Sequence, residues 1–160
     1  MHCSPITVTV PGSPQGKGRA RSFIRGAHIG HYTPDKTRPY EGLIRSAAID
    51  ELGGKPAFEQ PVEFTLHAVF PVPGSWSERK RLKALAGEIK PGKKPDLDNI
   101  VKTWNDALNG VVYRDDALIV GMSLEKRYGP QPLVICTVTP IESPARRTEG
   151  AAMLSVQPAA

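Results

Sequence analysis

The sequence predicts a single α/β (α+β) domain in which a mixed parallel and antiparallel sheet is packed with helices. The chain has 160 residues, enough for one domain with a substantial core. Its apolar and charged fractions, 39% and 23%, are ordinary for a globular protein. Periodic segments follow in the order strand, helix, strand, helix, helix, strand, strand. Helices packed against a sheet bury the apolar faces of such a series.

The N-terminal half predicts two strands and a helix around a long basic loop. Residues 6–10 (ITVTV) alternate and are β-branched, which is typical of a strand. Residues 11–39 carry six basic residues against one aspartate, with many glycines and prolines, and we expect an exposed, partly mobile loop. Residues 40–52 have apolar side chains at helical spacing and end at a Gly–Gly pair. Residues 62–72 begin with an alternating pattern and predict the second strand.

Two helices come next. Residues 75–86 predict a basic helix, and Ser75 is the candidate N-cap residue. Residues 97–109 predict a second helix, with Gly110 as its C-cap glycine.

The C-terminal part predicts two strands and a tail. Residues 117–126 and 133–139 are the strands, joined as a hairpin at Gly129–Pro130. Residues 141–160 are small, polar and unpatterned, so we expect a disordered tail after a folded domain of residues 1–140.

The charge and the cysteines narrow the function class. The net charge of +5 and a pI of about 9.4 favour an acidic partner, either nucleic acid or an anionic membrane. No apolar run approaches the roughly 20 residues of a membrane helix, and the N-terminus has no signal-peptide pattern. Cys3 and Cys136 are too few and too far apart for a disulfide framework or a zinc site. We therefore predict a cytoplasmic protein in which Cys136 belongs to the core.

The segment of residues 94–116, KPDLDNIVKTWNDALNGVVYRDD, gathers acidic residues around one helix in this basic chain. Each helical residue turns by about 100°. On that geometry one side is polar, formed by Asp98, Lys102, Asn105, Asp106 and Asn109. The opposite side is apolar, formed by Ile100, Val101, Trp104, Ala107 and Leu108. An ordinary amphipathic surface helix with an Asp98–Lys102 pair would have the same pattern.

Further aspartates flank this helix. Asp96 precedes it, where the helix dipole favours a carboxylate. Asp115 and Asp116 precede the next strand, and only one of them is expected to face the helix because adjacent residues in extended chain point to opposite sides. The short link at residues 110–114 allows three carboxylates to converge, a repulsion that a divalent cation relieves. Oxygen ligands favour Mg²⁺ or Mn²⁺ over zinc. A plain turn before a strand would also explain the aspartate pair.

The same segment resembles the signature of RusA-type Holliday junction resolvases. The resemblance lies in KPDLDN at residues 94–99, Lys102, DALNG at 106–110 and YRDD at 113–116, and it covers residues 94–128. It implies a RusA-like α/β fold and a Mg²⁺-dependent homodimer, often encoded by phages and prophages. Such enzymes cut four-way DNA junctions on two symmetric strands in recombination and repair. No small-molecule cofactor is implied.

The resemblance also assigns site residues. Asp96, Asp98 and Asp116 match the essential, metal-binding carboxylates, and Lys102 matches the essential lysine. Asp115 matches a recurring acidic position of less certain role. The loop at residues 11–39 and the tail lie outside the signature, so a preference for a cleavage sequence does not carry over.

Basic segments outside the signature are expected to contact DNA phosphates, with affinity falling steeply as salt rises. The candidates are Lys17, Arg19, Arg21, Arg25, Arg79, Lys80, Arg81, Lys83, Lys93 and Lys94. A solvated surface would carry similar charges. Three alternatives to a resolvase remain open from the sequence: a metal-dependent nuclease acting on other branched DNA such as flaps or forks, a DNA-binding module without catalysis, and a basic α/β protein that binds a membrane or a protein.

Overall fold

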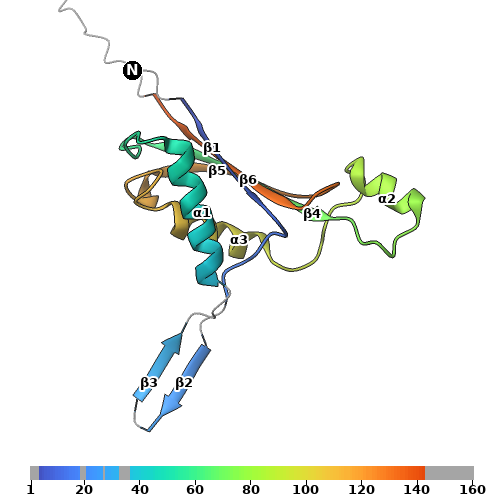
Figure 1. The fold of residues 1–160 in the computed structure, drawn as a ribbon, viewed down its shortest axis with the longest axis horizontal. Coiled ribbons are helices and arrows are strands. Elements are labelled where there is room, and N and C mark those ends of the chain that lie inside the picture. Colours follow the sequence, from blue (N-terminus) through green and yellow to red (C-terminus); the bar gives the residue numbers. More distant parts are fainter. Residues whose placement is uncertain (1–3, 19–20, 27, 33–36, 143–160) are drawn as a thin grey trace, which may run out of the picture.

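A four-stranded mixed sheet forms the body of the protein (Figure 1). The structure is a computed structural model that describes residues 4–18, 21–26, 28–32 and 37–142. The strand order is β1 (Ile6–Pro11), β6 (Leu133–Pro140), β4 (Val62–Pro71) and β5 (Ile119–Gly129). β4 and β5 are parallel, whereas β1–β6 and β6–β4 are antiparallel, so the predicted mixed sheet is confirmed.

One face of the sheet is buried beneath two helices, α1 (Thr37–Leu52) and α3 (Leu97–Leu108) (Figure 1). β1 alternates buried and exposed residues and β6 alternates buried and half-buried ones, as the period-2 pattern predicts. Phe64 on β4, Ile44 on α1 and Trp104 on α3 are fully buried in one core. Cys136 on β6 belongs to the same core, as predicted, and burial raises the pKa of its thiol. The apolar face of α3 is therefore an integral part of the core.

α2 (Glu78–Leu85) lies at one end of the molecule, after the central strand β4 (Figure 1). It is shorter than predicted, and Ser77, not Ser75, occupies the N-cap position. The Ser77 side chain makes no capping hydrogen bond, so side-chain capping does not mark the start of this helix.

The segment predicted as an exposed, partly mobile basic loop at residues 11–39 contains a hairpin, which corrects the prediction of a loop without strands. Strands β2 (Arg21–Arg25) and β3 (His28–Tyr32) pair antiparallel and project from the body of the protein (Figure 1). Arg25 pairs with His28, so the turn has two residues, and Gly26 has a φ of 64°. Two-residue hairpin turns require such a left-handed residue, which glycine supplies without a steric penalty.

The predicted hairpin of the last two strands is wrong. β5 and β6 do not pair with each other, because β4 lies between them. The connecting turn crosses the end of β4 closely: a Cβ on Gly129 would lie 2.4 Å from Cγ1 of Val69. Alternation along a strand predicts which face is buried but not which strand is the neighbour. The mostly buried β4 takes the central position.

The structure describes Ile141 and Glu142, and the remainder of the predicted tail, residues 143–160, lies outside the described residues. In the described part of the chain, no helix combines the length and the apolar character that a membrane span requires.

Candidate active site

The predicted polar stripe of α3 is present and faces away from the core. Ile100, Val101, Trp104, Ala107 and Leu108 are buried, and Asp98, Lys102, Asp106 and Asn109 are exposed. Asn105 is half-buried. Thr103, a polar residue outside the polar stripe, is also buried. Its hydroxyl donates a 3.1 Å hydrogen bond to the Asn99 carbonyl. The helix satisfies this buried hydroxyl internally and keeps its carboxylates in solvent.

The N-terminal end of α3 carries two exposed carboxylates. Asp96 occupies the N-cap position in an extended conformation, yet its side chain makes no capping hydrogen bond. The Asp98 carboxylate lies 3.4 Å from the Lys102 ammonium, one helical turn further along. The side chains of this pair are 66% and 62% exposed, so the contact is weak and open to exchange with an incoming ligand. Both carboxylates therefore remain accessible to a cation.

Asp115 and Asp116 have different roles in the structure. Asp115 caps the short 3-10 helix η1 (Asp116–Leu118), and its side chain accepts a 2.8 Å hydrogen bond from the amide of Ala117. Asp116 is exposed, and its charge contributes to the electrostatic environment of Tyr113. Burial raises the pKa of the Tyr113 phenol, and the charges of Asp116 and Asp106 raise it further. Asp115 is thus committed to a backbone hydrogen bond, whereas Asp116 is exposed to solvent.

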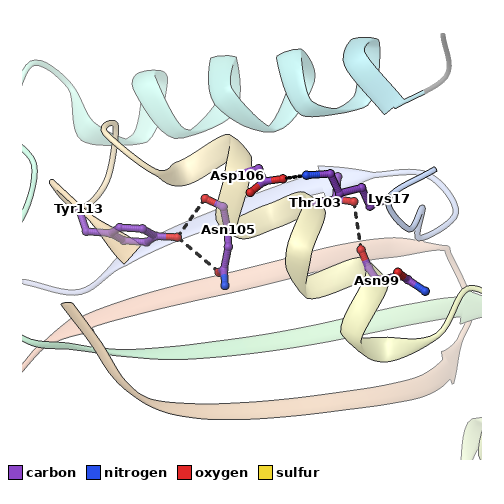
Figure 2. A network of polar contacts seen from close by, with 6 residues as sticks. All are labelled: Lys17, Asn99, Thr103, Asn105, Asp106 and Tyr113. Atoms are coloured by element: carbon purple, nitrogen blue, oxygen red, sulfur yellow. Dashed lines mark hydrogen bonds and ion pairs between the residues drawn. The ribbon is translucent and has the colours of Figure 1, made fainter. Parts of the chain in front are cut away.

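The C-terminal half of α3 is held by polar contacts, drawn in Figure 2. The buried Tyr113 hydroxyl donates to the carbonyl oxygen and the side-chain oxygen of Asn105, at 3.4 Å each. Asp106 forms an ion pair with Lys17, which belongs to the segment that leads to the β2–β3 hairpin. Asp106 is consequently neutralised by a residue of its own chain, in contrast to Asp96.

The stem of the hairpin, residues 16–18, lies directly on α3. The Lys17 amide donates a 3.0 Å hydrogen bond to the Asn99 carbonyl. A Cβ on Gly16 would lie 2.9 Å from Pro95 Cβ and 3.0 Å from Asn99 Cβ, so only glycine allows this approach. Residues of the stem and of the helix start together line an open depression, formed by Gly16, Lys17, Lys94, Pro95, Asp96 and Asn99. The hairpin is thereby joined to the acidic end of the helix.

The predicted DNA-contacting residues occupy several places in the fold. On α2, Arg79, Lys80 and Lys83 are exposed, and the Lys80 ammonium lies 4.0 Å from the centre of the Trp76 ring. Lys93 and Lys94 are exposed just before α3. Arg21 and Arg25 lie on β2, but only their backbone is described, and Arg19 lies outside the described residues.

Comparisons with known proteins show the family to which the chain belongs. The family model described as endodeoxyribonuclease RusA matches residues 11–139. The chain belongs to the RusA family. A relative, the uncharacterized protein YqaN of Bacillus subtilis (strain 168), is 33% identical over 136 residues, covering 84% of this chain and 94% of that protein. The RusA match extends well beyond residues 94–128, and it includes the hairpin, strands β4 and β5 and nearly all of β6.

RusA membership makes this chain one of a family of Holliday junction endonucleases, and it directs attention to metal binding. The donors fit a hard divalent cation, because Asp96, Asp98 and Asp116 offer exposed carboxylate oxygens. Within the described ranges, however, no three acidic, histidine or cysteine side chains form a ready-made metal site. The convergence of these three aspartates on one ion remains a prediction.

Sequence reasoning missed the contacts that three residues make near this site. Lys17 was assigned to DNA alone, although it pairs with Asp106. Lys126 and Glu125 on β5 hold the loop that leads to Asp96, and nothing in their local sequence indicates it. All three act between segments that are distant in sequence, so no spacing pattern could have predicted their contacts.

Proposed function

We propose that this protein is a Mg²⁺-dependent endonuclease that resolves four-way DNA junctions by paired, symmetric cuts in DNA recombination and repair. The observation that carries the proposal is the exposed group of Asp96, Asp98 and Lys102 at the start of α3 in a chain of the RusA family. These side chains face away from a core to which the rest of the helix belongs, so their position is rigidly supported.

The three aspartates and Lys102 have separate proposed roles. Asp96, Asp98 and Asp116 would hold the metal, with Mn²⁺ as a substitute. A bound divalent ion lowers the pKa of a water molecule and offsets charge on the scissile phosphate. Lys102 would turn from Asp98 to the phosphate and stabilise the negative charge that develops in the transition state. Its exposed ammonium and its weak contact with Asp98 leave it free to do so.

DNA binding is proposed for two basic regions on either side of this site. The β2–β3 hairpin carries Arg21 and Arg25, and α2 carries Arg79 and Lys80. Both elements extend from the body in Figure 1, as arms that follow separate DNA branches would. Neutralisation of phosphates by these residues predicts that the logarithm of the affinity falls linearly with the logarithm of the salt concentration.

A two-fold homodimer follows from the proposed reaction. Two symmetric cuts in one junction require two active sites related by the symmetry of the substrate. Each protomer would supply one group of Asp96, Asp98, Asp116 and Lys102.

The deciding experiment uses end-labelled four-way junctions, flaps, forks and linear duplex of the same sequence, each with and without Mg²⁺. Paired cuts at symmetric positions of the junction, dependent on the metal, are expected. Cleavage of flaps or forks in preference to junctions would show a nuclease of different specificity. Binding without cleavage in Mg²⁺ or Mn²⁺ would show a DNA-binding module and would contradict the proposal.

Lys102→Ala separates chemistry from binding. The expected result is a loss of cleavage of about 100-fold, the scale of one electrostatic catalytic group, with little loss of junction affinity. Equal loss of both would make Lys102 a binding residue only.

A further inference from the structure

The loop that leads to Asp96 is fastened to the edge strand β5. The Lys126 ammonium donates hydrogen bonds to two backbone carbonyls of this loop, that of Lys93 and that of Pro95, the latter at 3.0 Å. Pro95 immediately precedes Asp96. A single side chain on the sheet therefore holds the backbone on both sides of Lys94.

Side chains on both faces of the sheet contact this loop. Lys90 pairs with Glu125 at 2.8 Å, and Glu125 and Lys126 are adjacent in β5, so their side chains point to opposite faces. Lys126 is in register with the buried Ala68, on the face that the helices cover, and its ammonium lies 5.1 Å from the Phe70 ring centre. The loop thus passes around the edge of β5 between two anchoring contacts.

We propose that Lys126 is a positioning residue for the acidic end of α3. The inference rests on the proposed nuclease function. Lys126 would not contact DNA or metal; it would orient Asp96, and through the helix start Asp98, by fixing the two carbonyls before them. A side chain that fixes the backbone beside a ligating carboxylate acts much as the hydrogen-bond partners of metal ligands do. Loss of such hydrogen-bond partners costs about 10- to 100-fold in metal affinity or activity.

The local hydrogen-bonding pattern supports this assignment. The first intrahelical bond of α3 runs from the Ile100 amide to the Asp96 carbonyl, at 3.1 Å. Asp96 has no side-chain cap to hold this turn, so its placement depends on the backbone that precedes it. A shift of about 1 Å in a catalytic group can cost about 100-fold in rate, which makes such an anchor functionally important.

The test compares Lys126→Met with Lys55→Met. Both substitutions remove one lysine charge, and Lys55 is an exposed residue between α1 and β4. In Lys126→Met without metal, the Ile100 amide should exchange its hydrogen about tenfold faster than in the wild type. The kcat for junction cleavage should fall by about 10- to 100-fold, and the Mn²⁺ concentration that gives half the maximal rate should rise. Junction affinity should stay within about twofold. Lys55→Met should match the wild type in all four measurements.

Chemical rescue distinguishes the ammonium from the bulk of the side chain. Lys126→Cys in a Cys3→Ser background can be alkylated with 2-bromoethylamine, which places an ammonium close to the position of the lysine's; Cys136 is buried. The modified protein should recover slow Ile100 exchange and most of kcat. The treated Cys3→Ser parent controls for side reactions.

Three outcomes would overturn the proposal. Unchanged Ile100 exchange in Lys126→Met would show that the bonds do not hold the helix start. Faster exchange with unchanged kcat would show that the anchor is irrelevant to the chemistry. Weaker junction binding with unchanged kcat would make Lys126 a phosphate contact. If the wild type fails to cut junctions, the proposed function fails, while the exchange measurement still tests the anchoring role.

Discussion

The two ends of α3 carry the same kind of side chain in different surroundings. At the N-terminal end, Asp96 and Asp98 are exposed, and the only ion pair is the weak one with Lys102 within the described chain. At the C-terminal end, Asp106 is paired with Lys17 from the hairpin stem, and Asn105 receives the Tyr113 hydroxyl. The polar face of the helix therefore has an open end, which we propose to be the reactive end, and a structural end whose side chains are already paired.

Neutralising Asp98 tests this division directly. Asp98→Asn keeps the side-chain shape and removes the charge, so single-turnover cleavage of a four-way junction should fall by about 100-fold or more. Asp106→Asn, two turns further along the same face, should change the rate by less than about threefold, because its pairing with Lys17 is structural. Junction affinity of Asp98→Asn should be retained, since the variant removes a repulsive charge.

Near wild-type cleavage by Asp98→Asn would contradict the assignment of the N-terminal end. Equal losses in both variants would show that the whole polar face is reactive.

A pair of glycine substitutions tests how tightly the hairpin stem is joined to α3. Gly16→Ala introduces a Cβ at 2.9 Å from Pro95 Cβ, so it should lower the free energy of unfolding by about 1–3 kcal/mol. Gly42→Ala, within α1 and with nothing within 4 Å of the added Cβ, should instead raise it by about 0.5–1 kcal/mol. Urea unfolding of both variants measures the two values. If both substitutions changed the free energy of unfolding in the same direction, the stem would not be closely packed on α3.

Tyr113→Phe weakens the structural end alone. Loss of the hydroxyl that bonds Asn105 should cost about 1 kcal/mol in unfolding free energy. The metal dependence of cleavage should not change, because the N-terminal carboxylates keep their surroundings. A changed Mg²⁺ requirement in this variant would show that the two ends are coupled.

The ion pair between Lys90 and Glu125, which holds the loop to β5, should give a small, pH-dependent effect on stability. The hydrogen bond from Lys90, and then that from His67, lowers the pKa of the Glu125 carboxyl below its ordinary value of 4.5. Its contribution to stability is therefore present above about pH 4.5 and is lost as pH falls through the lower folded-state pKa. The side chain is 39% exposed, so the stabilisation is below about 1 kcal/mol. The difference in unfolding free energy between wild type and Glu125→Gln should shrink between pH 6 and pH 3; a constant difference would contradict the ion pair.

Much of the acidic helix could be predicted from residue order alone. The separation of Asp98 and Lys102 from Trp104 and Leu108 follows from the helical period, and burial confirms it. The family resemblance, not residue order, favoured Asp116 over Asp115 as a metal ligand. The hydrogen bond that the Ala117 amide donates to the Asp115 side chain supplies a structural reason for this preference. Helix N-caps were less predictable, since neither Ser77 nor Asp96 uses its side chain for capping.

Local periodicity determines which side of each element is buried, because it depends only on residues that are neighbours in the chain. Local periodicity does not determine which elements or residues pack against each other. The insertion of β4 between β5 and β6, the docking of Gly16 and Lys17 on α3, and the anchoring of the helix start by Lys126 all join residues far apart in sequence. Such contacts form only where the folded sheet brings the segments together, so tertiary packing alone separates the proposed reactive end of α3 from its structural end.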